Sequence, residues 1–232
     1  MSMEIDGKIC HIFSKGHSGP VLFWGIGTGE QESLKRMLKL LEQISDKKNW
    51  MLVAYESRDW NRDFSPWPAS GVWGKGCFSG GGEETMRWLL SSCIPYVQLH
   101  YNAGNYLSER LLGGYSLSGL FSLWAFYSSG QFGGVASCSG SLWYPNWEAF
   151  VKGKRIPKDS LVYLSLGKKE EQTKNQAMAR VGDITRRQYE ICRTSNPVGC
   201  VLEWNHGGHF QDPEARMAKG FGWLLNQLEE KV

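Results

Sequence analysis

The first part of the chain alternates short apolar runs with an amphipathic segment. Residues 20–24 form an apolar run that Gly25-Ile26-Gly27 closes, a pattern typical of a buried strand that ends in a tight loop. Between Glu32 and Ile44, leucine, methionine and isoleucine recur at helical spacing, which predicts an amphipathic helix. Residues 50–55 form the next apolar run. The pattern therefore predicts a strand, a helix and a second strand.

The same alternation continues to the C-terminus. Helical periodicity predicts further helices over residues 83–96, 117–128 and 175–193. Apolar runs predict further strands at residues 110–113, 134–138, 161–166 and 200–204. We expect the last helix to begin with Asp212 as its N-cap and Pro213 at its first position. Strands that alternate with helices are typical of an α/β fold with a mostly parallel sheet.

One long stretch, residues 56–82, follows neither pattern. It is rich in tryptophan, glycine and proline, and loops of this length are uncommon in compact domains unless they wall or cover a site. We therefore expect this loop to wall a functional site. The chain contains no repeat, no Pro/Ser linker and no break in composition, so we expect a single domain over residues 1–232.

Composition narrows the classes of function. The chain is 41% hydrophobic and 13% aromatic, enough for a sizeable core, which excludes a disordered protein. Its 26 Lys and Arg nearly balance its 23 Asp and Glu, and no long basic run occurs, so we expect no nucleic-acid partner. No segment reaches the roughly 18 to 20 apolar residues that span a bilayer.

Localisation follows from the N-terminus and the cysteines. The N-terminus lacks the apolar stretch of a signal peptide. The six cysteines are scattered without C-x-x-C pairs, as in proteins of a reducing compartment. We expect a soluble cytoplasmic protein that does not bind membranes; the sequence does not indicate its oligomeric state.

The segment Gly114-Tyr115-Ser116-Leu117-Ser118-Gly119 joins a predicted strand to a predicted helix. This is the context of a nucleophile elbow, a strained turn that projects a serine hydroxyl above the sheet. The residues two before and two after the nucleophile must be small, and Gly114 and Ser118 satisfy this requirement for Ser116. Ser118 is a poorer candidate, because Leu120 follows it at that distance. The alternative is a Gly/Ser-rich turn that only lets the helix pack on the sheet.

A serine nucleophile needs a base. Asn205-His206-Gly207-Gly208-His209-Phe210 lies between the last predicted strand and the last helix, where the histidine of such an enzyme belongs. We choose His209, because the preceding glycines allow its ring to turn toward the serine; His206 lies directly after the strand and is the alternative. A metal site at the two histidines lacks a third ligand nearby, so we expect no metal.

These residues resemble the esterase group of the α/β-hydrolase superfamily, which includes esterase D-like enzymes and the trilactone esterases that open ferric siderophores. The resemblance extends over nearly the whole chain, through residues 20–27, 64–68, 80–84, 113–121, 137–141 and 207–213. It implies a three-layer α/β-hydrolase fold with a mostly parallel central sheet. It also implies that Ser116 is the nucleophile and His209 the general base.

The resemblance places the acid on the loop after the strand at residues 161–166. Relatives often carry Asp or Glu just beyond the glycine of this loop, but here Lys168 and Lys169 occupy those positions. Glu170 is our choice. Glu171, Asp183 and a site without an acid stay open as alternatives, as does a solvated charge cluster at a helix start.

An oxyanion hole needs two donors. We expect the Leu117 N–H to be one donor, and the resemblance suggests the Ile26 N–H as the other. Among the eleven tryptophans, Trp60, Trp67 and Trp143 are candidates for the wall of an acyl or aryl pocket, although core packing is the usual role of such residues.

Together these features predict a serine hydrolase that cleaves a small-molecule carboxylic ester through an acyl-enzyme, without a cofactor. Two alternatives stay open. One is an acyltransferase on the same fold, and the other is a binding protein that has kept the fold and lost the chemistry.

Overall fold

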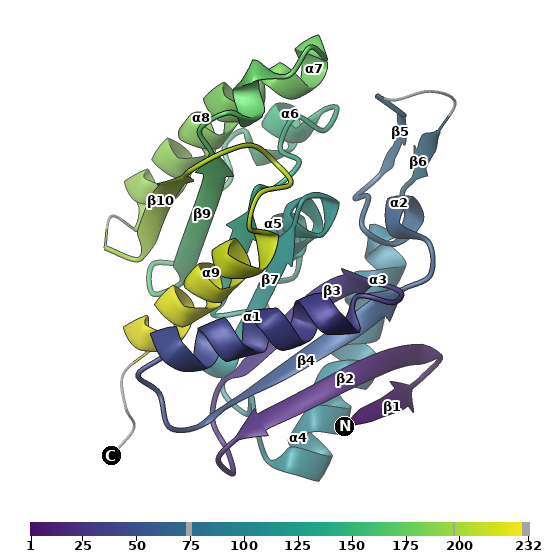
Figure 1. Ribbon diagram of the computed structural model, residues 1–232, viewed down its shortest axis with the longest axis vertical. Coiled ribbons are helices and arrows are strands. Elements are labelled where there is room, and N and C mark those ends of the chain that lie inside the picture. Colours follow the sequence, from purple (N-terminus) through teal and green to yellow (C-terminus); the bar gives the residue numbers. More distant parts are fainter. Residues whose placement is uncertain (73–75, 197, 229–232) are drawn as a thin grey trace.

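A twisted sheet runs through the centre of the protein (Figure 1). The computed structural model describes residues 1–72, 76–196 and 198–228, and within these ranges eight strands form the sheet in the order β1-β2-β4-β3-β7-β8-β9-β10. Their bounds are β1 Ser2–Ile5, β2 Lys8–Lys15, β3 Val21–Gly27, β4 Trp50–Ser57, β7 Arg110–Tyr115, β8 Gly134–Cys138, β9 Leu161–Gly167 and β10 Cys200–Asn205. The strands from β4 to β10 in this order are parallel, whereas β1 and β2 are antiparallel. The predicted α/β class with a mostly parallel sheet is confirmed.

The edge strand β1 and its neighbour β2 were not among the predicted elements. In β2, Cys10, His11 and Ile12 are buried in succession, so buried and exposed positions do not alternate. Polar side chains also occupy half of the strand. Its apolar run is therefore short and mixed, which explains why periodicity alone does not reveal it.

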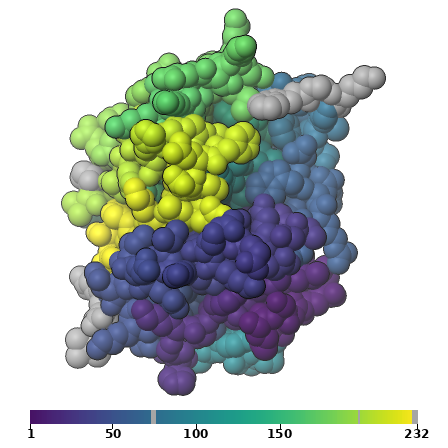
Figure 2. All heavy atoms as spheres, viewed as in Figure 1, coloured from purple at the N-terminus to yellow at the C-terminus, as the bar shows by residue number. Residues whose placement is uncertain are grey.

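Helices cover both faces of the sheet and make three layers. One face carries α1 (Gln31–Ile44) and α9 (Pro213–Gln227), which lie side by side in Figures 1 and 2. The predicted apolar stripe of α1 is buried here through Leu34, Met37, Leu38 and Leu41. The other face carries α3 (Gly82–Trp88), η1 (Leu89–Cys93), α4 (Ile94–Tyr101), α5 (Leu117–Ser129), α6 (Trp147–Val151) and α8 (Val181–Ser195). Two apolar clusters, one on each face, form the core.

Several helices differ from the predicted boundaries. The helix predicted over residues 83–96 continues to Tyr101 through the π-helical turn η1. The helix predicted over residues 175–193 is divided at Arg180 into α7 (Gln176–Ala179) and α8. The last helix begins at Pro213 as predicted, but Asp212 has a left-handed backbone (φ 51°) and its side chain makes no capping hydrogen bond. Asp212 is thus the N-cap residue as predicted, but its side chain does not supply the capping hydrogen bond.

The predicted loop over residues 56–82 is partly structured. It contains the short helix α2 (Trp60–Asp63) and a hairpin of β5 (Pro68–Ser70) and β6 (Cys77–Ser79). Residues 73–75 of this loop lie outside the described residues. Strands of three residues are too short to show a period, so the sequence pattern cannot detect the hairpin. The remaining short helices are η2 (Leu107–Glu109) and η3 (Glu170–Gln172).

The six cysteines are free thiols, and all except Cys77 are buried. Within the described ranges, we find no helix with both the length and the apolar composition needed to cross a membrane.

The crossing of β7 and α5 leaves no room for side chains on its glycines. A Cβ atom added to Gly114 would lie 2.3 Å from the backbone carbonyl carbon of Ser118. A Cβ atom added to Gly113 would lie 2.4 Å from the ring of Phe221 in α9. The backbones of β7 and α5 therefore lie in direct contact, and the Phe221 ring of α9 packs directly on the backbone of Gly113.

Gly114→Ala should lower the free energy of unfolding by about 1–3 kcal/mol, because the backbone of α5 must move to admit the methyl group. Urea unfolding measures this change. The matched control is Gly208→Ala, since a Cβ atom at Gly208 meets nothing within 4 Å; its free energy of unfolding should stay within about 0.5 kcal/mol of the wild type. Equal stability of the two variants would contradict the close approach.

Candidate active site

Ser116 sits in a strained turn directly between β7 and α5. Its backbone has φ 59° and ψ −123°, an unfavourable conformation for a residue with a side chain. The turn is held because the Ser116 N–H donates to the Cys138 carbonyl at 3.1 Å and the Ser116 carbonyl accepts from the Leu120 N–H at 3.1 Å. The Ser116 hydroxyl is thereby placed beyond the carboxyl end of β7.

The neighbouring Ser118 has a structural position. It is fully buried, and its hydroxyl donates to the Gly25 carbonyl at 2.8 Å. Ser118 therefore ties α5 to β3, and its oxygen is closed to a substrate.

His209 lies on the loop between β10 and α9 and faces Ser116. Its Nε2 is 3.0 Å from the Ser116 Oγ, and its Nδ1 is 2.7 Å from Oε2 of Glu170. The other histidine of this loop, His206, is exposed and contacts the side chain of Gln211 at 3.5 Å. The structure thus brings His209, and not His206, to the serine.

Glu170 is the acidic residue that the structure brings to the histidine. It begins η3, just after β9, and its side chain is only 4% exposed. Burial raises the pKa of Glu170, but the hydrogen bond and charge of His209, with bonds from the Ser139 hydroxyl and the Gly167 N–H, outweigh burial and lower this pKa below its usual value. The carboxyl group is therefore held as an anion.

The two other candidate acids point elsewhere. Glu171 pairs with Arg186 at 3.1 Å. Asp183 pairs with the same arginine at 3.0 Å, and its side chain is 75% exposed. Both belong to a surface ion-pair cluster.

The two predicted oxyanion donors lie at the edges of their elements. Leu117 is the first residue of α5, so its N–H belongs to the helix terminus where the dipole is positive. Ile26 lies near the end of β3, beside Glu56 of β4, and its side chain is buried. The roles of the two N–H groups stay predictions.

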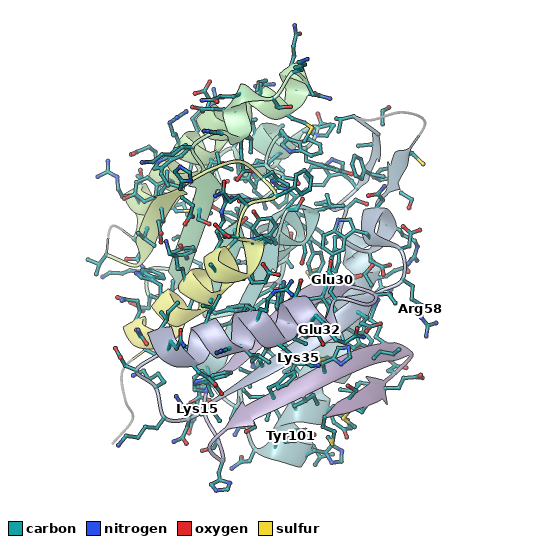
Figure 3. The ribbon with its side chains drawn as sticks, viewed as in Figure 1. Lys15, Glu30, Glu32, Lys35, Arg58 and Tyr101 are labelled. Carbon is teal, nitrogen blue, oxygen red and sulfur yellow. The ribbon has the colours of Figure 1, made fainter. Side chains whose placement is uncertain are left out.

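A cavity of about 320 Å³ opens beside Ser116 and His209. It lies at the N-terminal ends of α1 and α9, and it is lined by Trp24, Gly25, Glu30, Ser33, Trp60, Tyr115, Ser116, His209, Phe210, Pro213, Glu214 and Met217. Figure 3 marks Glu30 at the start of α1. Of this set, only Trp60, Ser116 and His209 were predicted to be site residues. The local pattern of the others does not show that α1 and α9 begin at the same place.

Trp67 and Trp143 do not border this cavity. The Trp67 indole donates to the Pro145 carbonyl at 2.9 Å, and its ring packs against Tyr144. Trp143 packs against Phe78 of β6. A contact of Trp67 or Trp143 with substrate stays a prediction. Trp60 lines the cavity, as such a contact requires.

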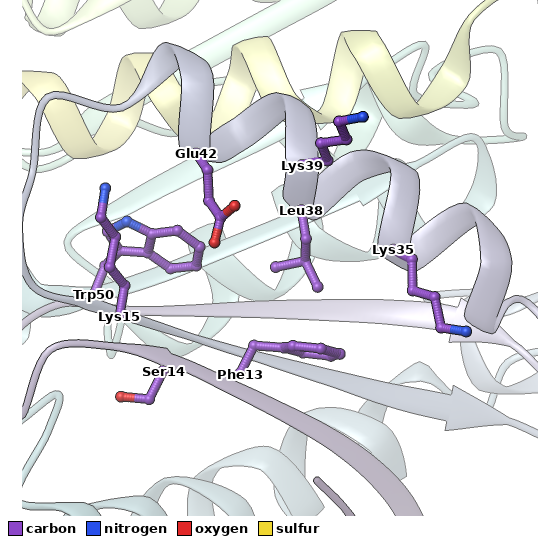
Figure 4. Close-up of a pocket in the computed structure, with 8 residues that line it drawn as sticks. All are labelled: Phe13, Ser14, Lys15, Lys35, Leu38, Lys39, Glu42 and Trp50. Atoms are coloured by element: carbon purple, nitrogen blue, oxygen red, sulfur yellow. The ribbon is translucent and has the colours of Figure 1, made fainter.

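A second cavity, of about 300 Å³, lies between α1 and β2 (Figure 4). It is lined by Phe13, Ser14, Lys15, Lys35, Leu38, Lys39, Glu42 and Trp50. It lacks a histidine and a cysteine, so it offers no comparable nucleophile and base. Within the part of the chain that the structure describes, no group of three or more His, Cys, Asp or Glu side chains is arranged to hold a metal ion.

A second serine–histidine–glutamate contact occurs at the edge of the sheet. The Ser2 hydroxyl is 2.7 Å from Nδ1 of His11, and Nε2 of His11 is 2.8 Å from Glu56. None of these residues lines either cavity. His11 is buried, and we assign this contact to the anchoring of β1 on β2 and β4.

Sequence reasoning also missed Arg216, which is 2% exposed and lies in the first turn of α9. Its guanidinium donates to Oε1 of Glu170 at 2.8 Å. The only sequence signal is an arginine beside Met217 and Ala218, on the apolar side of an amphipathic helix.

Comparison with known sequences gives one distant similarity. No protein-family model matches the sequence. The sequence is 25% identical over 163 residues to the uncharacterized protein YbbA of Bacillus subtilis (strain 168). The matched region covers 67% of this chain and 65% of YbbA. The chain thus spans less than two thirds of that relative's length.

Solved structures give a broader likeness. The IroE-like serine hydrolase from Shewanella oneidensis aligns with a TM-score of 0.73 and 16% identity, over 94% of this chain and 75% of that one. The siderophore hydrolase EstA from Aspergillus nidulans aligns with a TM-score of 0.69 and 17% identity, over 94% and 90%. The chain therefore shares the fold of these two hydrolases.

Glu170→Gln should lower the free energy of unfolding at pH 7 by about 3–5 kcal/mol, because it leaves the buried Arg216 without its anionic partner. The lowered pKa of Glu170 fixes the sign of the pH dependence. Its contribution to stability is fully present above the usual glutamate pKa and is lost as the pH falls through the lowered value. The gap between wild type and variant should therefore be constant above about pH 5 and narrow below about pH 4.

Urea unfolding between pH 3 and pH 7 measures this gap. The matched control is Glu171→Gln, which removes one half-exposed ion pair with Arg186 and should cost about 0–1 kcal/mol. A gap of the same size in both variants, or one that widens in acid, would show that Glu170 is not a stabilised buried anion.

Proposed function

We propose that the protein is a serine hydrolase that cleaves a carboxylic ester through an acyl-enzyme. The observation that carries the proposal is the continuous chain of contacts from the Ser116 Oγ to Nε2 of His209 at 3.0 Å, and from Nδ1 of His209 to Glu170 at 2.7 Å. A nucleophile, a base and a group that orients the base stand in the order that acyl transfer needs.

In the first half of the reaction, Ser116 is acylated. His209 Nε2 takes the hydroxyl proton as the Ser116 oxygen attacks the ester carbonyl. The carbonyl oxygen becomes an oxyanion, which the N–H groups of Leu117 and Ile26 stabilise. As the tetrahedral intermediate collapses, His209 returns its proton to the departing alkoxide, and the alcohol leaves.

In the second half, water replaces the alcohol. His209 takes a proton from water, which attacks the acyl carbonyl; the same donors hold the second oxyanion, and the proton then returns to Ser116 as the acid departs. Throughout, Glu170 accepts from the Nδ1–H of His209, which fixes the tautomer and stabilises the imidazolium. The scheme uses only groups of this chain, and we propose no metal or organic cofactor.

The similar structures support ester hydrolysis as the reaction class. One is a serine hydrolase and another is a siderophore hydrolase. A binding protein without chemistry has no use for the strained backbone of Ser116, which costs stability, or for a buried carboxylate directed at His209. Site geometry and neighbours together favour an enzyme.

The cavity indicates the size of the substrate. Its volume of about 320 Å³ is near the lower end of ligand pockets. Trp60 and Phe210 supply aromatic surface, and Phe210 is 86% exposed at the rim. We propose a small ester whose acyl or alkoxy group packs against these rings.

Ser116→Ala should lower kcat for a simple aryl ester by about 10⁴-fold or more while the protein stays folded, because the covalent route loses its nucleophile. His209→Ala should cost nearly as much, since the members of a triad act as a unit. The control is Ser118→Ala, whose hydroxyl is buried against β3. Steady-state hydrolysis and circular dichroism measure the outcome. If Ser118→Ala were inactive and Ser116→Ala active, the assignment of the elbow would be wrong.

Aryl esters with a common leaving group and acyl chains of two, four and eight carbons should differ by about tenfold or more in kcat/KM, the shortest being fastest, because the cavity is small. Adding an acceptor alcohol should leave the free acid as the main product. A transesterified main product would instead establish the acyltransferase alternative. A preference for the eight-carbon chain would refute the size argument and leave the serine mechanism intact.

A further inference from the structure

The guanidinium of Arg216 is buried beside Glu170 in the candidate active site. Its Nη1 donates to Oε1 of Glu170 and to the Ser139 hydroxyl, both at 2.8 Å. Ser139 in turn donates to the same Oε1 at 2.7 Å, from a left-handed backbone with φ 46°. One carboxylate oxygen of Glu170 is thus fixed from several sides, which leaves Oε2 aimed at His209.

The same guanidinium holds the loop that carries the base. Its Nη2 donates to the carbonyls of His206 at 3.0 Å and Gly208 at 2.8 Å. Gly208 is the residue directly before His209. Arg216 therefore bonds both to the acid and to the backbone of the histidine loop.

Tyr115 completes the link. Its hydroxyl accepts from Nη1 of Arg216 at 3.1 Å and donates to the His209 carbonyl at 2.5 Å. The carbonyls of residues 206, 208 and 209 are thereby held by Arg216, directly or through Tyr115. Tyr115, which directly precedes the proposed nucleophile Ser116, is thus linked to both Arg216 and the histidine loop.

We propose that Arg216 is a positioning residue for hydrolysis. Its single buried guanidinium fixes the carboxylate of Glu170 and the imidazole of His209 relative to each other. This inference rests on the proposed function. A planar fork can bond Glu170 with one nitrogen and the loop carbonyls with the other, which a lysine ammonium cannot reproduce. A displacement of about 1 Å between reacting groups can cost about 10² in rate, so such positioning matters to catalysis.

The charge of Arg216 has a separate effect on the pH profile. The titratable and charged groups that face Glu170 are His209, Arg216 and Tyr115, and Cys138 lies beside them, its thiol donating to the Arg216 carbonyl at 3.4 Å. Arg216 offsets part of the carboxylate charge that stabilises a protonated imidazole. Removing Arg216 should move the acid limb of the pH profile of kcat/KM to higher pH. Glu170→Gln should move the same limb to lower pH.

The test compares Arg216→Met with Arg216→Lys on the same aryl ester. We expect Arg216→Met to lose about 10² in kcat/KM, mostly in kcat, and to show the shift of the acid limb to higher pH. Arg216→Lys should recover about tenfold of the loss and restore the position of the acid limb, because it restores the charge but not the fork. Arg193→Met removes an exposed arginine paired with Glu190 and serves as the control.

A second comparison separates positioning from general damage to the fold. In a His209→Ala background, Arg216→Met should change the residual rate by less than about threefold, since the group that Arg216 positions is gone. A loss of about 10² in both backgrounds would assign Arg216 a purely structural role. If Arg216→Met does not fold, Arg216→Lys and Tyr115→Phe take its place in the same comparison.

The outcomes distinguish this inference from the proposed function. Wild-type rates in Arg216→Met and Arg216→Lys, together with full dependence on Ser116, would overturn the role of Arg216 and leave the hydrolase standing. Hydrolysis that survives Ser116→Ala would overturn both.

Discussion

The site is organised around one buried negative charge. The side chain of Glu170 is 4% exposed. Its carboxylate lies between two groups that bind it, the guanidinium of Arg216 at 2.8 Å and the imidazole of His209 at 2.7 Å. A buried charge without a partner is costly, so each of these contacts stabilises the others. Because the guanidinium and the imidazole approach different oxygens, the carboxylate can fix the imidazole and remain anchored to α9.

The sheet explains how groups so distant in the sequence meet. Ser116 follows β7, Glu170 follows β9 and His209 follows β10, and these strands are parallel. The carboxyl ends of parallel strands share one edge of the sheet, where ligand sites of α/β proteins form. The strained backbone of Ser116 and the close approach of Gly114 to Ser118 raise the serine hydroxyl above that edge. Fold and chemistry thus depend on the same turn.

Sequence reasoning reached the parts of this site that local rules control. The small residues around Ser116 and the glycines before His209 carry local signals, and the structure brings both side chains together. Among the acidic candidates the sequence favoured Glu170 but left Glu171 and Asp183 open, because Glu170 and Glu171 differ only in where η3 directs their side chains. Arg216 could not be predicted, since its partners lie on four segments far apart in the sequence and its own helix has an ordinary amphipathic pattern. Strand β1 and the hairpin of β5 and β6 were missed because these strands are short, and β2 was missed because polar side chains interrupt its apolar pattern.

The central claim is that Ser116 is the residue that becomes covalently acylated. The most direct test is to treat the wild-type protein with a fluorophosphonate, which phosphonylates an activated serine, and to locate the adduct by peptide mass spectrometry. We predict one adduct per chain, on Ser116, and none in Ser116→Ala. An adduct on Ser118 or on Ser2, or an unmodified protein that still hydrolyses an aryl ester, would contradict the account.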